Sequence, residues 1–161
     1  QEYLQNVLNT DKKLDAYDSG RIYYYLGDYQ KAYLALEEAK GKGGVDSYLY
    51  LGKAYAATGD YNYASSVYSN YLSKQGPDAE IYNQLGLCEL AKKDYQKALE
   101  AFQAGKQIEG NSLMQTLSFN EIVAYEYLQD YQKAAVLLKA YLQNYPDDQA
   151  AIREQQFLST R

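Results

Sequence analysis

The side chains of this chain that could do chemistry are 21 carboxylates, 21 tyrosines and one cysteine, and none of its 161 residues is a histidine. Histidine is the commonest general base and the commonest metal ligand, so its absence removes Ser-His-Asp and Cys-His catalysis. The cysteine, Cys88, stands in the apolar stretch LGLCEL, where we expect a small buried hydrophobic residue. A single cysteine cannot close an intramolecular disulfide.

Two further patterns resemble chemical motifs and have simpler structural explanations. The glycine cluster GKGGVDS at residues 41–47 lacks the spacing of a phosphate-binding loop and follows no predicted strand, so a turn is expected there. The pairs Glu37-Glu38 and Asp147-Asp148 fit a solvated helix face and a helix cap. We therefore predict no enzyme activity, no cofactor and no metal.

Charge and hydropathy exclude two classes of partner. The net charge is −5, only three residues are arginines, and no basic stripe is present, so nucleic-acid binding is not expected. No run approaches the roughly 18 apolar residues that a membrane span needs. With 47% hydrophobic and 23% charged residues, the composition is that of a folded protein.

One short motif, Asp-Tyr-x-x-Ala, recurs along the chain as GDYQKA, GDYNYA, KDYQKA and QDYQKA. Its aspartates stand 32, 34 and 36 residues apart, at Asp28, Asp60, Asp94 and Asp130. A period near 34 residues is typical of stacked structural repeats.

Residues 46–77 show what one repeat builds. Tyr48, Leu51 and Tyr55 have the spacing of one helix face, and a second helical pattern begins at Tyr61. Gly59 can end the first helix and Asp60 can cap the second, so the unit is a helix–turn–helix hairpin.

Small residues recur at fixed places in these hairpins. We expect the small residues of paired helices to face each other, so that the two backbones come close, and the motif tyrosine to pack at the start of the second helix. The residues concerned are Gly20, Gly52 and Gly86 in first helices, and Ala32, Ala64, Ala98 and Ala134 in second helices.

The chain resembles the tetratricopeptide repeat (TPR) family. The second repeat carries that family's loose pattern at Tyr48, Leu51, Gly52, Tyr55, Ala64, Tyr68 and, one place late, Pro77. The third repeat departs from it with Glu89 and the fourth with Ile122, which should push its helices apart or shift their register. The resemblance implies an all-α, right-handed solenoid of about four repeats with terminal capping helices.

The expected organisation is a single solenoid domain over residues 1–161. Its parts are an N-terminal cap or degraded repeat at 1–12, repeats at 13–44, 45–78, 79–114 and 115–148, and a C-terminal capping helix at 149–161. Ala151, Phe157 and Leu158 are expected to cover the last repeat.

The resemblance also implies a non-catalytic scaffold that binds a protein or peptide segment in a concave groove lined by first helices. The expected groove residues are Tyr17, Arg21, Tyr24, Tyr50, Lys53, Asn83, Gln84, Phe119, Asn120 and Tyr127. The lysine, asparagine and arginine clamp of chaperone-binding members is not reproduced at the matching positions.

Two alternatives stay open. The chain could be a self-assembly module that dimerises through tyrosines or end helices, or an accessory domain of a larger enzyme or envelope complex. A monomer or a homodimer is therefore expected. The tyrosine-rich, histidine-free repeats, and a start at Gln1 instead of methionine, resemble soluble parts of bacterial repeat lipoproteins, which favours the cell envelope over the cytosol.

Overall fold

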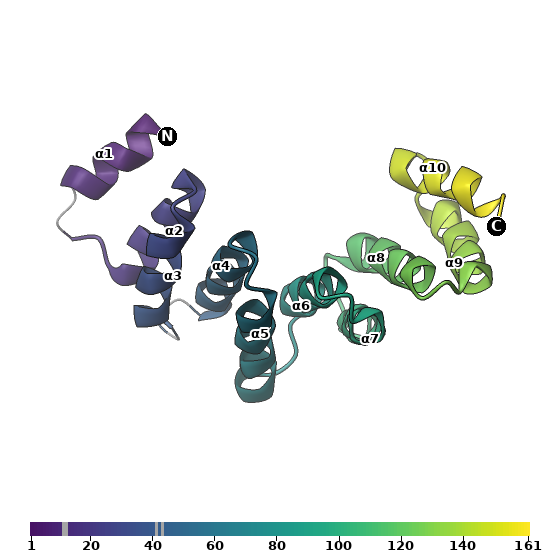
Figure 1. Cartoon of the computed structure of the whole chain (residues 1–161), viewed down its shortest axis with the longest axis horizontal. Helices are drawn as coiled ribbons and strands as arrows, with labels where there is room; N and C mark the ends of the chain where they lie inside the picture. The colour runs from purple at the N-terminus through teal and green to yellow at the C-terminus, as the bar shows by residue number, and fades with distance from the viewer. Residues whose placement is uncertain (11–12, 41, 43) are drawn as a thin grey trace. The chain divides into compact units, whose positions relative to one another are not determined.

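The computed structural model describes residues 1–10, 13–40, 42 and 44–161, and over these ranges the chain forms ten α-helices and no strand (Figure 1). The residues divide into two compact units, Gln1–Gly76 and Pro77–Arg161. The predicted all-α class is confirmed. The single-domain description and the repeat bounds stay predictions.

Unit 1 consists of one helix followed by two hairpins. Its helices are α1 (Glu2–Thr10), α2 (Ala16–Leu26), α3 (Tyr29–Glu38), α4 (Gly44–Ala57) and α5 (Tyr61–Gln75). Helix α2 packs against α3, α3 against α4 and α4 against α5, and α2 also contacts α4. The first helices of the two hairpins therefore lie next to each other.

Unit 2 consists of two hairpins followed by one helix. Its helices are α6 (Ala79–Ala91), α7 (Tyr95–Lys106), α8 (Met114–Tyr127), α9 (Tyr131–Asn144) and α10 (Gln149–Leu158). Here too each helix packs against the next, and α10 rests on α9. Helix–turn–helix repeats stack on their neighbours in this way.

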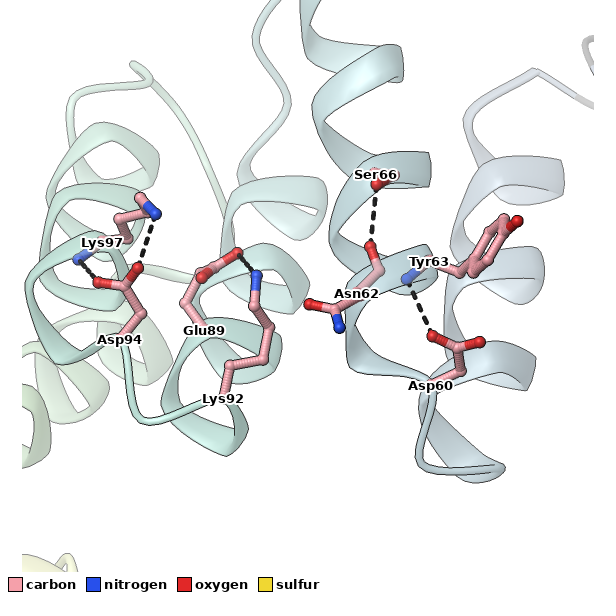
Figure 2. A network of polar contacts seen from close by, with 8 residues as sticks. All are labelled: Asp60, Asn62, Tyr63, Ser66, Glu89, Lys92, Asp94 and Lys97. Carbon is pink, nitrogen blue, oxygen red and sulfur yellow. Dashed lines mark hydrogen bonds and ion pairs between the residues drawn. The ribbon is translucent and has the colours of Figure 1, made fainter.

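The Asp-Tyr-x-x-Ala motif forms the corner of every hairpin, as predicted. Each motif aspartate accepts the backbone N–H three residues later, which satisfies one of the free donors at a helix start. The pairs are Asp28 with Lys31, Asp60 with Tyr63, Asp94 with Lys97 and Asp130 with Lys133. Figure 2 shows this contact at Asp60 and at Asp94.

The residue before each of these aspartates has a left-handed backbone. Gly27 and Gly59 adopt it with φ of 82° and 84°, and Lys93 and Gln129 adopt it with φ of 64° and 63°. Glycine takes this conformation without strain, whereas a side chain disfavours it. The third and fourth corners therefore have a non-glycine residue, Lys93 or Gln129, in a backbone conformation that favours glycine.

The glycine of a first helix makes room for a large side chain of the second helix. A Cβ atom at Gly52 would lie 2.3 Å from Tyr68 Cζ, and one at Gly86 would lie 2.3 Å from Phe102 Cε1. Both rings are fully buried. The motif alanines are fully buried as well. The prediction that each of these two glycines faces the motif alanine is wrong, because each faces the ring four residues after that alanine.

The fourth hairpin combines a larger residue with a smaller partner. Ile122 takes the glycine position and is buried in one apolar cluster with Ala134 and Leu138. Leu138 stands where the second and third hairpins have Tyr68 and Phe102. The predicted separation or register shift of α8 and α9 stays a prediction.

The last helix covers the fourth hairpin through part of the expected set. Asp148 caps α10 by accepting the N–H groups of Ala150 and Ala151. Ala151 and Leu158 are buried in the same cluster as Ile122. Phe157 is 40% exposed, so its predicted role in this contact is wrong.

Helix α1 has no fully buried residue, and its Leu4, Val7 and Leu8 are half-buried. Whether it is a cap or part of a degraded repeat stays open. The glycine-rich turn predicted over residues 41–47 is only partly testable, because Gly41 and Gly43 lie outside the described residues. Residues 44–47 form the first turn of α4, so the prediction of a turn is wrong for them. No helix in the described part of the chain is long and apolar enough to span a bilayer.

Candidate functional site

Four of the ten predicted groove residues come together in unit 1. Tyr17, Arg21 and Tyr24, together with Tyr25, stand at helical spacing on α2, and they meet Tyr50 of the adjacent helix α4. These five residues are called the tyrosine–arginine cluster below. The hairpin packing that brings α2 against α4 assembles it.

Arg21 is the centre of this cluster. Its guanidinium carbon lies 5.2 Å from the centroid of the Tyr17 ring and 5.3 Å from that of Tyr50, which is the distance range of a cation–π contact. An ion pair joins it to the Asp18 carboxylate over 3.9 Å, and the side chains of Arg21 and Asp18 are 40% and 54% exposed. Arg21 Nε is buried and has no hydrogen-bond partner. The guanidinium is thus positioned by two rings and by a hydrogen bond with Tyr50, with donor capacity left over.

The tyrosine hydroxyls of the cluster form a polar rim. The hydroxyls of Tyr25 and Tyr50 are 2.5 Å apart, and the Tyr17 hydroxyl donates to Asp46 Oδ2 over 3.4 Å. The Tyr24 ring lies edge-on to Tyr25 and Tyr50, with centroids 5.7 and 5.5 Å away. This rim combines ring surface with groups that both donate and accept.

Three phenols of the cluster, Tyr17, Tyr24 and Tyr25, have a raised pKa and stay neutral at physiological pH. Burial raises the pKa of Tyr17 and of Tyr24 above 10. The hydrogen bond with Tyr50 raises the pKa of Tyr25, whereas the charges of Arg21 and Lys53 act in the opposite direction. The predicted residue Lys53 therefore lies close enough to the cluster to act on it electrostatically.

The predicted groove residues of unit 2 are arranged differently. Asn120 of α8 donates its side-chain amide to Asn83 Oδ1 of α6 over 2.8 Å, so this pair connects two first helices. Gln84 instead donates to Glu80 one turn earlier on its own helix. The structure thus brings Asn83 and Asn120 together without Gln84.

Two predicted residues of unit 2 contact second helices. The Phe119 ring packs against Tyr141 of α9 at 5.7 Å, and it belongs to the apolar surroundings of the Ile122 cluster. Tyr127 is 54% exposed and stacks on Tyr95 of α7 at 4.9 Å. Both rings already have an aromatic partner within the fold.

Sequence reasoning missed two features around these residues. It did not pair Tyr17 with Asp46, which lies 29 positions further along the chain. It also missed a stack of Tyr33, Tyr55 and Tyr63, one ring from each of α3, α4 and α5. The recurrence of tyrosine at hairpin positions was the available signal, but ring orientation cannot be inferred from spacing.

The structure offers little support for catalysis or metal binding among the residues that it describes. No group of three or more acidic or cysteine side chains in these ranges could hold a metal ion. Burial raises the pKa of the Cys88 thiol to about 12, and the side chain is 4% exposed. Cys88 is therefore a buried structural residue, as predicted, because a reactive cysteine needs an accessible thiolate.

Comparison with known families identifies the repeats. Tetratricopeptide repeat models match residues 49–112 and 119–148, which together make up more than half of the chain. The chain belongs to the tetratricopeptide repeat family. The first matched range contains most of α4 and all of α5, α6 and α7. The second contains α9 and all but the start of α8.

Solved TPR structures have the same fold. A crystal structure of MamA is 21% identical, with a TM-score of 0.77 over 89% of this chain and 78% of that one. The second TPR domain of human RPAP3, solved in complex with an HSP70 peptide, is 16% identical, with a TM-score of 0.61 over 68% of this chain and 90% of that domain. A comparison with curated protein sequences gave no significant match.

Proposed function

We propose that this TPR protein is a non-catalytic interaction scaffold, and that in unit 1 the tyrosine–arginine cluster binds an extended segment of a protein partner. The observation that carries the proposal is Arg21, which two tyrosine rings position while its Nε atom stays unpaired. Membership of the TPR family supports the general role, and the RPAP3 domain is a TPR domain solved with a peptide.

The cluster has the composition of a binding hot spot. Tyrosine and arginine are enriched at such sites because they give large contact areas and lose little conformational entropy on binding. Here the rings already contact one another, so part of that ordering precedes binding. An extended segment would place an apolar side chain against the rings and a carbonyl or carboxylate oxygen at the guanidinium.

Asn120 is proposed as a second contact point, in unit 2, and the buried Asn83, which is 5% exposed, orients it. An asparagine side chain has two donors and one acceptor oxygen, so the hydrogen bond between the two amides leaves donor and acceptor capacity on both. Such groups suit the backbone N–H and C=O of an extended peptide.

A peptide selection on the purified chain tests the role of unit 1. Peptides from a random displayed library are selected for binding, and the Kd of the best one is measured by titration calorimetry. Arg21→Ala and Tyr50→Ala should each weaken binding about tenfold or more, because hot-spot truncations cost about 2 kcal/mol.

The matched controls are Arg153→Ala and Tyr3→Ala, since both side chains are exposed and neither belongs to the cluster. They should leave the Kd unchanged within twofold. If the selected peptides bind the Arg21 and Tyr50 variants as tightly as the wild type, the cluster is not the binding site.

A second candidate function is self-assembly through the last helix. The observation that favours it is Phe157 on α10, which is 40% exposed where the sequence predicted a buried contact. Its ring is covered on one side by the guanidinium of Arg161, 4.6 Å from the ring centroid. In this case Phe157→Glu should convert a dimer into a monomer.

A further inference from the structure

Two glutamates that the proposed function does not use meet between α8 and α10. Glu126 stands in the last turn of α8, and Glu154 stands in the middle of α10. Glu126 lies one turn after Ile122 on α8, and Glu154 lies between Ala151 and Leu158 on one face of α10, so the packing of these apolar residues places the two carboxyl groups close together. Ala151 and Leu158 of α10 are buried in the cluster that contains Ile122 of α8. The carboxyl pair is therefore a second contact between these two helices.

The burial of Glu126 makes this pair sensitive to protonation. Its Oε1 atom is buried and receives no hydrogen bond from any donor. Ionised carboxylates can only accept hydrogen bonds, so two of them in contact have no donor between them. A single proton on the pair supplies that donor and removes the repulsion of two like charges.

In the described part of the chain, no positive charge contributes to the shifted pKa of Glu126. The lysines of α9, Lys133 and Lys139, and Arg153 of α10 have exposed side chains. Glu154 is the charged residue that acts on Glu126. Burial raises the pKa of Glu126 to about 7, and the charge of Glu154 and the hydrogen bond with it act in the same direction.

We propose that Glu126 and Glu154 form a proton-dependent latch, which holds α10 on the last hairpin when the pair shares one proton and loosens α10 when both groups are ionised. Loosening α10 uncovers the apolar side chains of Ile122 and Leu138, against which Ala151 and Leu158 pack. The packing of α10 on the last repeat thus depends on pH.

The sign of the effect follows from proton linkage. With α10 released, Glu126 would titrate near its ordinary value of 4.5, whereas in the folded state it keeps its proton up to about pH 7. The folded state therefore binds more protons between these values, and the stability of the α10 contact falls as the pH rises through that window. The contact is strongest below about pH 4.5 and weakest above about pH 7.

Amide hydrogen exchange followed by NMR tests the latch in the whole chain. After correction for intrinsic exchange rates, the protection of amides in α10 should fall about tenfold or more between pH 5 and pH 8, since one pKa unit corresponds to a factor of ten. Amides in the middle of α6, which belongs to the same unit, serve as the internal reference and should keep constant protection.

Substitutions then assign the effect to the pair. Glu126→Gln keeps the shape and provides a permanent donor without charge, so α10 protection should stay high and become independent of pH. Glu109→Gln, in the exposed turn after α7, is the matched control and should retain the wild-type dependence.

A titration of the wild-type protein also tests the latch, without any substitution. In carbon-detected NMR of the wild type, one glutamate carboxyl should titrate near pH 7 in step with the α10 amides. If every glutamate carboxyl titrates below pH 5.5, or if the α10 protection shows no pH dependence, the latch does not exist. A Glu126→Gln protein with the same pH dependence as the wild type would also overturn it.

Discussion

Single residues decide how closely the two helices of each hairpin approach. Gly52 and Gly86 leave the space that the buried rings of Tyr68 and Phe102 fill, and no larger side chain fits at either place without movement. In the fourth hairpin the first helix has a larger side chain, Ile122 in place of glycine, and the second helix has a smaller one, Leu138 in place of a ring. The total volume at the contact matters more than which helix supplies it.

Gly52→Ala should therefore destabilise the protein, although alanine favours helix more than glycine does. The new methyl group would meet the Tyr68 ring at 2.3 Å, and overpacking of this kind costs about 1–3 kcal/mol, against a helix-propensity gain of about 1 kcal/mol. Urea unfolding followed by circular dichroism should show a lower midpoint.

The double variant Gly52→Ala with Tyr68→Leu provides the control. Leucine lacks the ring atoms that stand in the way, so the two changes should cost less together than the sum of their separate costs. Strict additivity would contradict a direct contact between the two positions. Ser69→Ala on the exposed side of α5 should have little effect.

The sequence anticipated part of this residue-scale detail. The burial of the four motif alanines and the buried state of Cys88 followed from helical spacing. The ring opposite each glycine did not, because the partner depends on how two helices are rotated about their axes. The Glu126–Glu154 contact was missed for a similar reason: it joins two residues 28 positions apart that belong to no repeated pattern.

At the scale of elements, each hairpin corner depends on one aspartate. The sequence predicted these corners correctly, because a helix cap is a local contact over three residues. In two of them the cap also forms an ion pair, from Lys31 to Asp28 and from Lys97 to Asp94 (Figure 2 shows the second).

Acid should weaken these two corners. The hydrogen bond from Lys97 holds the pKa of Asp94 below its ordinary value of 3.8, and Lys31 does the same for Asp28. A carboxyl whose pKa is lowered by folding stabilises the fold above its unfolded pKa, and it loses that contribution as the pH falls through its folded pKa. The loss therefore occurs below about pH 3.8.

Asp60→Ala should destabilise unit 1 by about 1 kcal/mol, the usual cost of removing a helix N-cap. The Tyr63 N–H would lose its acceptor, and α5 would fray at its start. Thermal unfolding should report a lower Tm, with faster amide exchange in the first turn of α5.

Asp60→Asn is the matched variant, because asparagine also accepts a hydrogen bond at this position, and it should restore most of the stability. Asn62→Ala, two residues into the helix, removes a side chain that does not cap α5 and should have little effect. Equal losses in the Asn62 and Asp60 variants would contradict the cap assignment.

At the scale of the whole molecule, the chain belongs to the TPR family, and the proposed function is to bind another protein. The sequence predicted this class because a period of about 34 residues is visible without structural information. For the tyrosine–arginine cluster, the sequence predicted which residues of the first helices face a partner, but it did not predict the contacts among them. The unpaired Arg21 Nε became visible only with the rings in place.

The solution mass, measured by light scattering over a concentration series, distinguishes a surface that is open to a different protein from one that pairs two copies of the chain. We expect a constant mass near 18.3 kDa, unchanged by Arg21→Ala. A stable dimer that Arg21→Ala converts into a monomer would contradict it, since the cluster would then bind a second copy of the chain instead of a different protein.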